Sequence, residues 1–250
     1  MKKINLNDGT TAYCLKQNEA IVLDDHIKGY LKYGIKINNG DVIIDVGANI
    51  GILGLRLSQS YHDITIHAFE PIPEIHKVLK KNSEISQNPK FNTYMMGISN
   101  VNKKVQFTYY PNSPALSTTQ PDIWKQDKNN FIAAVRGNIT SAPKQFWWAK
   151  FIPQFITPLI AKYLTSNSQI ITSNVITLSN FVKDYKIKQI NLLKIDCEGE
   201  EINVLNGISD SNWKIINNII MEVNDVENNL EKAKTILLNN GFKNIQTQKT

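Results

Sequence analysis

The sequence predicts one α/β domain in which a mostly parallel sheet carries helices on both faces. Residues 41–51, DVIIDVGANIG, are an apolar run that ends in an acidic residue and a glycine-rich turn, and the helical pattern ILGLRLSQS follows at once. Two later apolar runs, ITIHAFE and INLLKID, also end in an acidic residue. Apolar strands that alternate with helices are typical of parallel sheets, which bind ligands at the carboxyl ends of their strands. A length of 250 residues fits one such domain.

Each element follows from a local pattern. Residues 1–20 are expected to form a short strand or arm and residues 21–33 a helix that ends at Gly34, so that residues 1–34 form an N-terminal arm and helix. Apolar runs bounded by turn residues predict the strands 41–46, 64–70, 91–99, 103–110, 190–196 and 215–223. Helical periodicity predicts the helices 50–60, 74–86, 177–186, 202–208 and 228–241. Residues 242–250 are expected to begin one more strand.

Residues 120–168 fit no repeat of strand and helix. The segment is rich in aromatic residues in its second half and contains prolines at positions 143, 153 and 158. We interpret it as a helical insertion on the substrate side of the domain, because insertions of this length are typically lids or binding walls. Covering an edge of the core is an equally good interpretation for any one of its aromatic side chains.

Charge and composition narrow the classes of function. The formal net charge is +6, but the lysines are scattered among acidic residues and asparagines, which indicates a solvated surface and no nucleic-acid partner. The two cysteines, Cys14 and Cys197, have neither metal-like nor redox spacing, which predicts a reducing compartment. The N-terminus lacks the apolar core of a signal peptide, and residues 146–164 carry two lysines and two prolines, so no membrane span is expected. The predicted location is cytoplasmic.

The glycine-rich turn discriminates between nucleotide-like ligands. Gly47 and Gly51 let the backbone turn sharply and let a ligand approach the main chain. Asn49 stands where a dinucleotide fingerprint has its second glycine, and no Lys-Ser/Thr pair follows, so the turn is neither that fingerprint nor a P-loop. Asp45 would repel a pyrophosphate and suits a ligand with ammonium and sulfonium charges, such as S-adenosylmethionine. Glu70, roughly twenty residues beyond the turn, is placed to bind the ribose of an adenosine.

Four motifs occur in order along the chain: DVGANIG, FEPIP, GIS after the third strand, and LLKIDCEGEEINVLNGI. With them the chain resembles the FkbM-type family of S-adenosylmethionine-dependent methyltransferases, from about residue 19 to the C-terminus and leaving out most of 120–168. The resemblance implies a Rossmann-like class I methyltransferase fold with a mostly parallel, seven-stranded sheet whose last edge strand is incomplete in this sequence. Two further segments resemble those of particular family members: YLKYGIKINNGD and FTYYPNSPALST. These members are associated with polyketide and nonribosomal-peptide assembly lines and methylate hydroxyls of natural products.

The resemblance also implies S-adenosylmethionine as the cofactor and S-adenosylhomocysteine as its product. It assigns the cofactor to the glycine turn and the ends of the second and third strands: Asp45, Gly47, Ala48, Asn49, Gly51, Glu70, Pro71, Gly97, Ile98 and Ser99. It assigns Glu70 to the ribose, which agrees with the distance of Glu70 from the glycine turn in the sequence. It places residues 97–99 near the adenine. Cys197 stands where the family often has valine, and we interpret it as a packing residue.

Methyl transfer to a hydroxyl needs an in-line arrangement and removal of the hydroxyl proton. The candidate bases are Asp196, Glu198 and His26, although Glu198 could instead shape the N-terminus of the following helix. The candidate substrate contacts are Tyr110, Ser117, Trp124, Trp147, Trp148, Glu222 and Asn224. No cluster of acidic or histidine ligands accompanies Asp196, so no metal is expected to be required.

The predicted function is O-methylation of a small-molecule natural product, a polyketide or polyketide-peptide, with assembly-line components as partners. Three alternatives stay open. A sugar O-methyltransferase acting on a polysaccharide or glycoconjugate shares the family, an RNA methyltransferase would need a basic groove with aromatic residues, and a non-catalytic scaffold would be expected to lose Asp45 or Glu70. The insertion discriminates between a natural-product acceptor and a sugar acceptor. An apolar lining favours a polyketide-like acceptor and a polar lining favours a sugar.

Overall fold

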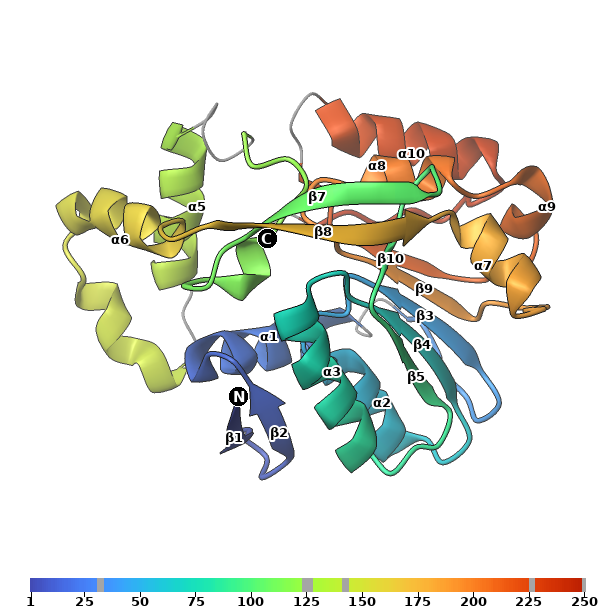
Figure 1. The fold of residues 1–250 in the computed structure, drawn as a ribbon, viewed down its shortest axis with the longest axis horizontal. Helices are drawn as coiled ribbons and strands as arrows, with labels where there is room; N and C mark the ends of the chain where they lie inside the picture. The colour runs from blue at the N-terminus through green and yellow to red at the C-terminus, as the bar shows by residue number, and fades with distance from the viewer. Residues whose placement is uncertain (31–33, 123–127, 141–143, 225–227, 249–250) are drawn as a thin grey trace.

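The centre of the molecule is a five-stranded parallel sheet in the order β10-β9-β3-β4-β5 (Figure 1). The computed structural model describes residues 1–30, 34–122, 128–140, 144–224 and 228–248. The strands of this sheet are β3 (Val42–Val46), β4 (Thr65–Phe69), β5 (Phe91–Tyr94), β9 (Leu192–Ile195) and β10 (Ile219–Met221). Each lies inside a segment that the apolar pattern predicts, so the predicted parallel α/β class is confirmed.

The order of the strands creates a switch point beside β3. From β3 the chain proceeds to β4 and β5 on one side, whereas β9 and β10 lie on the other side. In open α/β sheets, ligands bind in the crevice at the carboxyl ends of the strands where the order reverses in this way. The glycine turn of residues 47–51 follows β3 directly and therefore lies at this crevice.

Helices cover both faces of the sheet. One face is covered by α1 (Gln17–Tyr30), α2 (Ile52–Ser60) and α3 (Pro73–Ile85). The other face is covered by α7 (Leu178–Asp184), α8 (Glu201–Asn206) and α10 (Asn229–Asn239), with the short helix α9 (Asp210–Trp213) between the last two. In Figure 1, α2 and α3 lie below the sheet and α8 and α10 above it. A hydrophobic core lies on each face of the sheet, and successive strand residues point into opposite cores. Ile43 packs toward the first group of helices and Ile44 toward the second.

The N-terminal arm is a hairpin that Asn82 fixes to the domain. Strands β1 (Lys2–Asn5) and β2 (Thr11–Cys14) pair in antiparallel fashion. The fully buried side chain of Asn82, in α3, accepts a hydrogen bond from the Tyr13 N–H at 2.7 Å and donates one to the Tyr13 carbonyl at 2.9 Å. It also donates to the carbonyl of Ile50, in the glycine turn, at 2.7 Å. Asn82 thus connects the hairpin, α3 and the turn.

A second sheet of three strands, in the order β6-β8-β7, carries the insertion. Strand β7 (Lys103–Tyr109) pairs in antiparallel fashion with β8 (Gln169–Ile176), and β6 (Gly97–Ile98) pairs in parallel with β8. The predicted strand 91–99 is therefore divided between two sheets. The sequence pattern does not predict β8, because most of its residues are exposed or half-buried and no continuous apolar face marks it.

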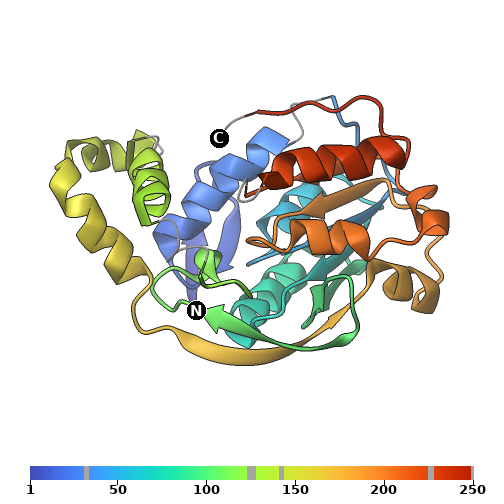
Figure 2. The same ribbon diagram turned by 90° about the horizontal axis from the view of Figure 1, so that it is seen from above.

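The insertion begins and ends beside one end of this β7–β8 ribbon, where Tyr109 is paired with Gln169. Its described elements are α5 (Lys128–Thr140), the 3₁₀ segments η3 (Lys144–Phe151) and η4 (Gln154–Ile156), and α6 (Thr157–Leu164). Helices α5 and α6 pack together around Phe131, Val135 and Ala161. Both views place these helices to one side of the five-stranded sheet (Figures 1 and 2).

The C-terminal segment differs from the expectation. Residues 242–248 form no strand, so neither the further edge strand nor the seven-stranded sheet is confirmed among the described residues. Phe242 instead packs its ring against Trp213 at a centroid distance of 6.0 Å. Within the described part of the chain, every helix is too short or too polar to cross a membrane.

We predict that Asn82→Ala lowers the free energy of unfolding by about 2–3 kcal/mol, because it leaves the half-buried Tyr13 N–H and the buried Ile50 carbonyl without partners. Urea denaturation measures this change. Lys77→Ala, at an exposed position of the same helix, is the control and should change the stability by less than about 0.5 kcal/mol. Equal stability of the two variants would show that Asn82 does not hold the hairpin in place.

Candidate functional site

The glycine turn after β3 closes directly onto the loop after β9. Gly47 has a φ of 72°, and a Cβ atom added to it would lie 1.8 Å from the carbonyl oxygen of Asp196. Asn49 and Gly51 also have left-handed backbones, with φ of 51° and 80°. Only glycine permits so close an approach at position 47. The turn and the loop that carries Asp196 therefore form one continuous wall.

Four charged side chains at the carboxyl edge share one face of the sheet. Residues of the core under α1, α2 and α3 include Ile43, Ala68, Leu192 and Ile220. Two residues further along the same strands stand Asp45, Glu70, Lys194 and Glu222. Because successive residues of a strand point to opposite faces, all four side chains are directed to the side on which α1 lies.

Lys194 is the buried cation of this group, with 5% of its surface exposed. Its Nζ donates a hydrogen bond to the carbonyl of Gly47 at 2.7 Å and lies 3.1 Å from Asp45 Oδ1 and 3.5 Å from Asp196 Oδ2. The contact with Asp45 is an ion pair that lacks the angles of a hydrogen bond. Burial alone would lower the pKa of Lys194, but Asp45 and Asp196 raise it above its ordinary value. The lysine therefore remains charged, while burial raises the pKa of Asp45 against the opposing effect of Lys194.

A chain of contacts joins Lys194 to His26 through two acids and a tyrosine. Tyr30, in α1, donates from its hydroxyl to Glu222 Oε1 at 2.8 Å and lies 3.4 Å from Asp196 Oδ2. His26 Nε2 lies 3.1 Å from the same oxygen of Glu222. Burial raises the pKa of Glu222, and Asp196 raises it further. The arrangement thus joins the imidazole of His26, the carboxylate of Glu222 and the hydroxyl of Tyr30 in one line of contacts.

The turn of residues 197–200 presents Glu198 with a left-handed backbone, at a φ of 52°. Burial and the nearby Asp196 raise the pKa of Glu198 well above its usual range. Glu201 shapes this turn, since its Oε1 accepts hydrogen bonds from the N–H groups of Cys197 at 3.2 Å and Gly199 at 2.9 Å. Glu201 therefore shapes the start of the following helix, and both roles considered for Glu198 stay predictions. Burial also raises the pKa of the Cys197 thiol, which agrees with a packing role.

Glu70 is fixed at the end of β4 and is almost fully buried. Its Oε1 accepts a hydrogen bond from the Ile72 N–H at 2.9 Å. Burial raises the pKa of Glu70 to about 7, and hydrogen bonds from the backbone of Ile72 and Asn49 oppose that shift. The carboxyl group is therefore tied to the glycine turn and to the start of α3.

A cleft of about 2900 Å³ contains most of the predicted site. The predicted bases His26, Asp196 and Glu198 line it, as do the predicted cofactor residues Gly47, Asn49, Glu70, Pro71, Gly97, Ile98 and Ser99. Of the predicted substrate contacts, it is lined by Ser117, Trp148, Glu222 and Asn224. Asp45 and Ala48 are buried behind this wall, and Gly51 packs against Leu79 and Phe91, so these three would act on a ligand through the turn.

The insertion supplies an apolar wall of the same cleft. The lining residues from it include Phe131, Val135, Phe146, Trp148, Ala149, Ile152, Ile160 and Leu164. Trp147, in contrast, is 63% exposed, and Tyr110 is buried with its N–H donating to Ser117 Oγ at 3.2 Å. Neither residue lines the cleft, and their role as substrate contacts stays a prediction. Trp124 lies outside the described residues.

Three further residues in or beside the cleft were not predicted from the sequence as site residues: Lys194, Tyr30 and Glu19. Lys194 carries a signal, since an ionisable residue inside an apolar strand is unusual and points to a buried partner. Tyr30 follows His26 by four residues and therefore shares its helix face, with ring centroids 5.5 Å apart. Glu19 lines the cleft and accepts a hydrogen bond from Ser113 Oγ at 2.7 Å, and burial raises its pKa to about 7. No short motif marks Glu19.

In the part of the chain that the structure describes, His, Cys, Asp and Glu side chains form no group of three or more that could hold a metal ion. The expectation that no metal is required stays a prediction.

The fold and the site together define a class of protein. A parallel sheet with a switch point, a glycine turn at that point and an acid-lined cleft beside it are typical of α/β proteins that bind a nucleotide-like ligand at the carboxyl edge. The family model described as the methyltransferase FkbM domain matches residues 45–243. The chain therefore belongs to the FkbM methyltransferase family, and the predicted family is confirmed.

Three similar proteins carry names that state a methyltransferase activity. Methyltransferase 1 of Beauveria bassiana (strain ARSEF 2860) is 30% identical over 201 residues, which are 80% of this chain and 71% of that protein. The 31-O-demethyl-FK506 methyltransferase FkbM of Streptomyces tacrolimicus is 28% identical over 245 residues, 97% of this chain and 89% of that protein. Methyltransferase sdnD of Sordaria araneosa is 27% identical over 207 residues, 80% of this chain and 73% of that protein.

The raised pKa of Glu70 predicts a pH-dependent stability. Its folded pKa of about 7 exceeds the ordinary 4.5, so the stability that it contributes is fully present below about pH 4.5 and is lost as the pH rises to about 7. Glu70→Gln removes this titration. Relative to the unsubstituted protein, the variant should gain about 2 kcal/mol in free energy of unfolding between pH 5 and pH 8.

Urea denaturation at the two pH values measures this gain. Glu84→Gln, at an exposed position of α3, should show a difference from the unsubstituted protein that does not change with pH. A pH-independent difference for Glu70→Gln as well would mean that Glu70 is ionised in the folded protein at pH 5.

Proposed function

We propose that this protein is an S-adenosylmethionine-dependent O-methyltransferase that methylates a hydroxyl of an apolar small-molecule natural product. The observation that carries the proposal is the chain of contacts from His26 through Glu222 and Tyr30 to Asp196, which borders the same cleft as Glu70. One cleft thus offers a histidine–carboxylate pair for proton removal and a separate buried acid for an adenosine. Family membership supports the methyl transfer.

The charges in the cleft suit a cationic methyl donor. Asp196, Glu198 and Glu222 line the crevice, while Lys194 is turned toward Asp45 and the Gly47 carbonyl. Such an environment attracts ammonium and sulfonium groups and repels a pyrophosphate. When bound, S-adenosylmethionine supplies an electrophilic methyl group. In this proposal Glu70 accepts hydrogen bonds from the ribose hydroxyls, and the residues Gly97, Ile98 and Ser99 flank the adenine.

His26 is the general base of the proposed reaction. Its Nε2 is held at 3.1 Å from Glu222 Oε1, which leaves Nδ1 to accept the proton of the acceptor hydroxyl. Glu222 orients the imidazole ring and balances its charge after proton transfer, and Tyr30 in turn holds Glu222. Asp196 is engaged by Tyr30 and Lys194, which favours a positioning role for it.

The apolar wall of the insertion supports an apolar acceptor. A sugar needs polar partners for its many hydroxyl groups, whereas Phe131, Ile152 and Leu164 offer none. The name of one similar protein, a 31-O-demethyl-FK506 methyltransferase, supports natural-product chemistry and transfer to oxygen. We therefore favour a polyketide-like acceptor over a polysaccharide, with biosynthetic assembly-line components as partners.

We predict that Glu70→Ala weakens S-adenosylhomocysteine binding about tenfold to a hundredfold, because two hydrogen bonds from ribose to a charged or buried acceptor are lost. Isothermal titration calorimetry measures the affinity. Glu84→Ala, on the exposed side of α3, is the matched control and should bind normally. Unchanged affinity of Glu70→Ala would remove the ribose assignment.

We predict that His26→Gln keeps its affinity for S-adenosylhomocysteine and loses about 10²–10⁴-fold in turnover, since a positioned base contributes a factor of this size. Glu222→Gln should lose turnover in the same direction. The first acceptor to test is 31-O-demethyl-FK506, with release of S-adenosylhomocysteine as the measured signal. His62→Gln, at an exposed position, is the control. Full turnover in His26→Gln together with a loss in Asp196→Asn or Glu198→Gln would assign the base to those carboxylates.

A further inference from the structure

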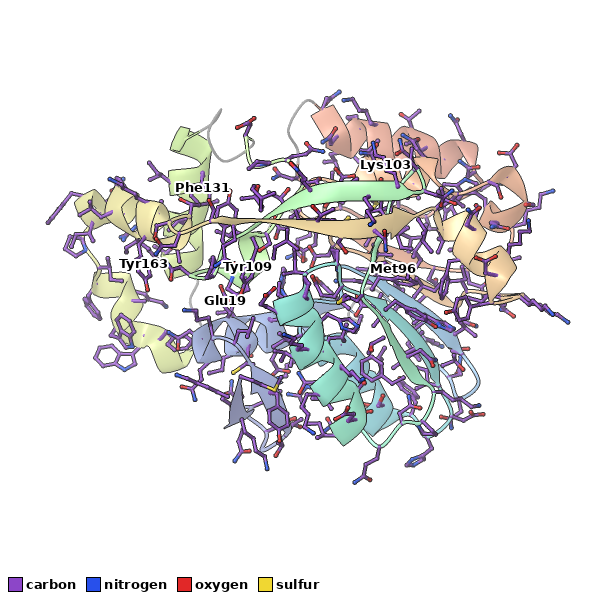
Figure 3. All side chains as sticks on the ribbon, in the orientation of Figure 1. Glu19, Met96, Lys103, Tyr109, Phe131 and Tyr163 are labelled. Atoms are coloured by element: carbon purple, nitrogen blue, oxygen red, sulfur yellow. The ribbon has the colours of Figure 1, made fainter. Side chains whose placement is uncertain are left out.

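The second half of the insertion carries exposed large apolar side chains. They occur at every fourth residue from position 147 to position 163: Trp147, Phe151, Phe155, Leu159 and Tyr163. Between 59% and 79% of each of these residues is exposed, and the rings of Trp147 and Phe151 touch at a centroid distance of 5.8 Å. Figure 3 shows Tyr163 at the end of the molecule that lies away from the five-stranded sheet. We call these five residues the outer row.

The inner side of the same segment is apolar as well. Ala149, Ile152, Ile160 and Leu164 line the cleft, and the last two also pack against Phe131 of α5. A helical segment that only separates a cleft from water carries polar residues on its outer side, whereas one that is apolar all round is covered on both sides. An exposed apolar patch of this kind marks an interaction site. The outer row therefore requires a covering partner.

The charge of the insertion selects an anionic partner. The insertion, residues 120–168, contains six basic residues and two acidic ones, Asp122 and Asp127. The basic residues are Lys125, Lys128, Arg136, Lys144, Lys150 and Lys162. Lys150 and Lys162 are exposed, and each directly precedes a member of the outer row. The five apolar residues are thus accompanied by an excess of basic over acidic residues in the insertion.

We propose that the outer row is a docking surface for an anionic lipid bilayer. Tryptophan and tyrosine prefer the boundary between lipid headgroups and acyl chains, phenylalanine and leucine enter the acyl region, and lysine side chains reach the phosphates. A second copy of this chain fits less well, because a symmetric contact would bring Lys150 and Lys162 of the two copies together. Protein interfaces in general are depleted of lysine.

The placement of the surface has a consequence that rests on the proposed function. Residues of the outer row alternate along residues 147–164 with residues that line the cleft, such as Ala149, Ile152 and Ile160. A protein docked through the outer row would hold its cleft directly above the bilayer. An apolar acceptor dissolved in the membrane would then enter the cleft without crossing water.

The test is co-sedimentation of the full chain with vesicles, which needs no acceptor and no activity. Vesicles of phosphatidylcholine alone are compared with vesicles of equal parts phosphatidylcholine and phosphatidylglycerol at low and high salt. The protein should sediment with the anionic vesicles and be released as salt rises. The triple variant Phe151→Ser, Phe155→Ser, Leu159→Ser and the double variant Lys150→Glu, Lys162→Glu should each bind at least about tenfold more weakly.

Matched controls change an exposed apolar and an exposed basic residue elsewhere. Leu238→Ser in α10 and Lys183→Glu in α7 should sediment as the unsubstituted protein does. Circular dichroism and S-adenosylhomocysteine calorimetry establish that each variant is folded. The proposal is overturned if the unsubstituted chain stays in the supernatant with anionic vesicles at low salt, or if the triple variant sediments normally. A dimer in light scattering that the triple variant abolishes, without vesicle binding, would identify a second copy as the partner instead.

Discussion

The buried ammonium group of Lys194 is the interaction on which the carboxyl edge of the sheet depends. Oxygen atoms from Asp45, the Gly47 carbonyl and Asp196 converge on it. They belong to a strand, to the turn that follows it and to the loop of a neighbouring strand. Without the cation these oxygens would face one another in a poorly solvated space, and removing one partner of a buried pair typically costs about 3–5 kcal/mol. The lysine thus permits an acidic crevice to exist at the switch point.

Further hydrogen bonds connect the carboxyl edge of the sheet to the segments around it. Tyr30 connects α1 to the acids of the crevice, and Asn82 holds the hairpin that precedes α1, so the N-terminal segment is part of the site wall. On the other side, Thr118 and Gln120 donate hydrogen bonds to the carbonyls of Glu198 and Gly199 at 2.7 and 3.0 Å. The segment that leads into the insertion is therefore bonded to the loop after β9. A movement of the insertion would therefore also displace the loop after β9, which carries Asp196 and Glu198.

The sequence predicts the parts of the structure that are coded locally. Apolar runs identify β3, β4 and β9 because buried parallel strands must be apolar, and the glycine turn is recognisable because the approach of Gly47 to Asp196 excludes a side chain. Strand β8 escapes prediction because it is mostly exposed. The contact of Tyr30 with Glu222 escapes it for another reason, since 192 residues separate the two and periodicity does not say where a helix docks. The alternation along the strands could have shown that Asp45, Lys194 and Glu222 share a face.

The residues proposed to bind the methyl donor and those proposed to bind the acceptor lie in different parts of the fold. Residues that face the proposed donor stand at the ends of buried strands, where a change would disturb the core. Residues that face the proposed acceptor, such as Phe131 and Ile152, stand on an insertion that is joined to the domain by the β7–β8 ribbon. A segment attached in this way can change its lining without altering the register of the central sheet. In the proposed function the insertion therefore determines the class of acceptor, and the crevice at the switch point binds the methyl donor.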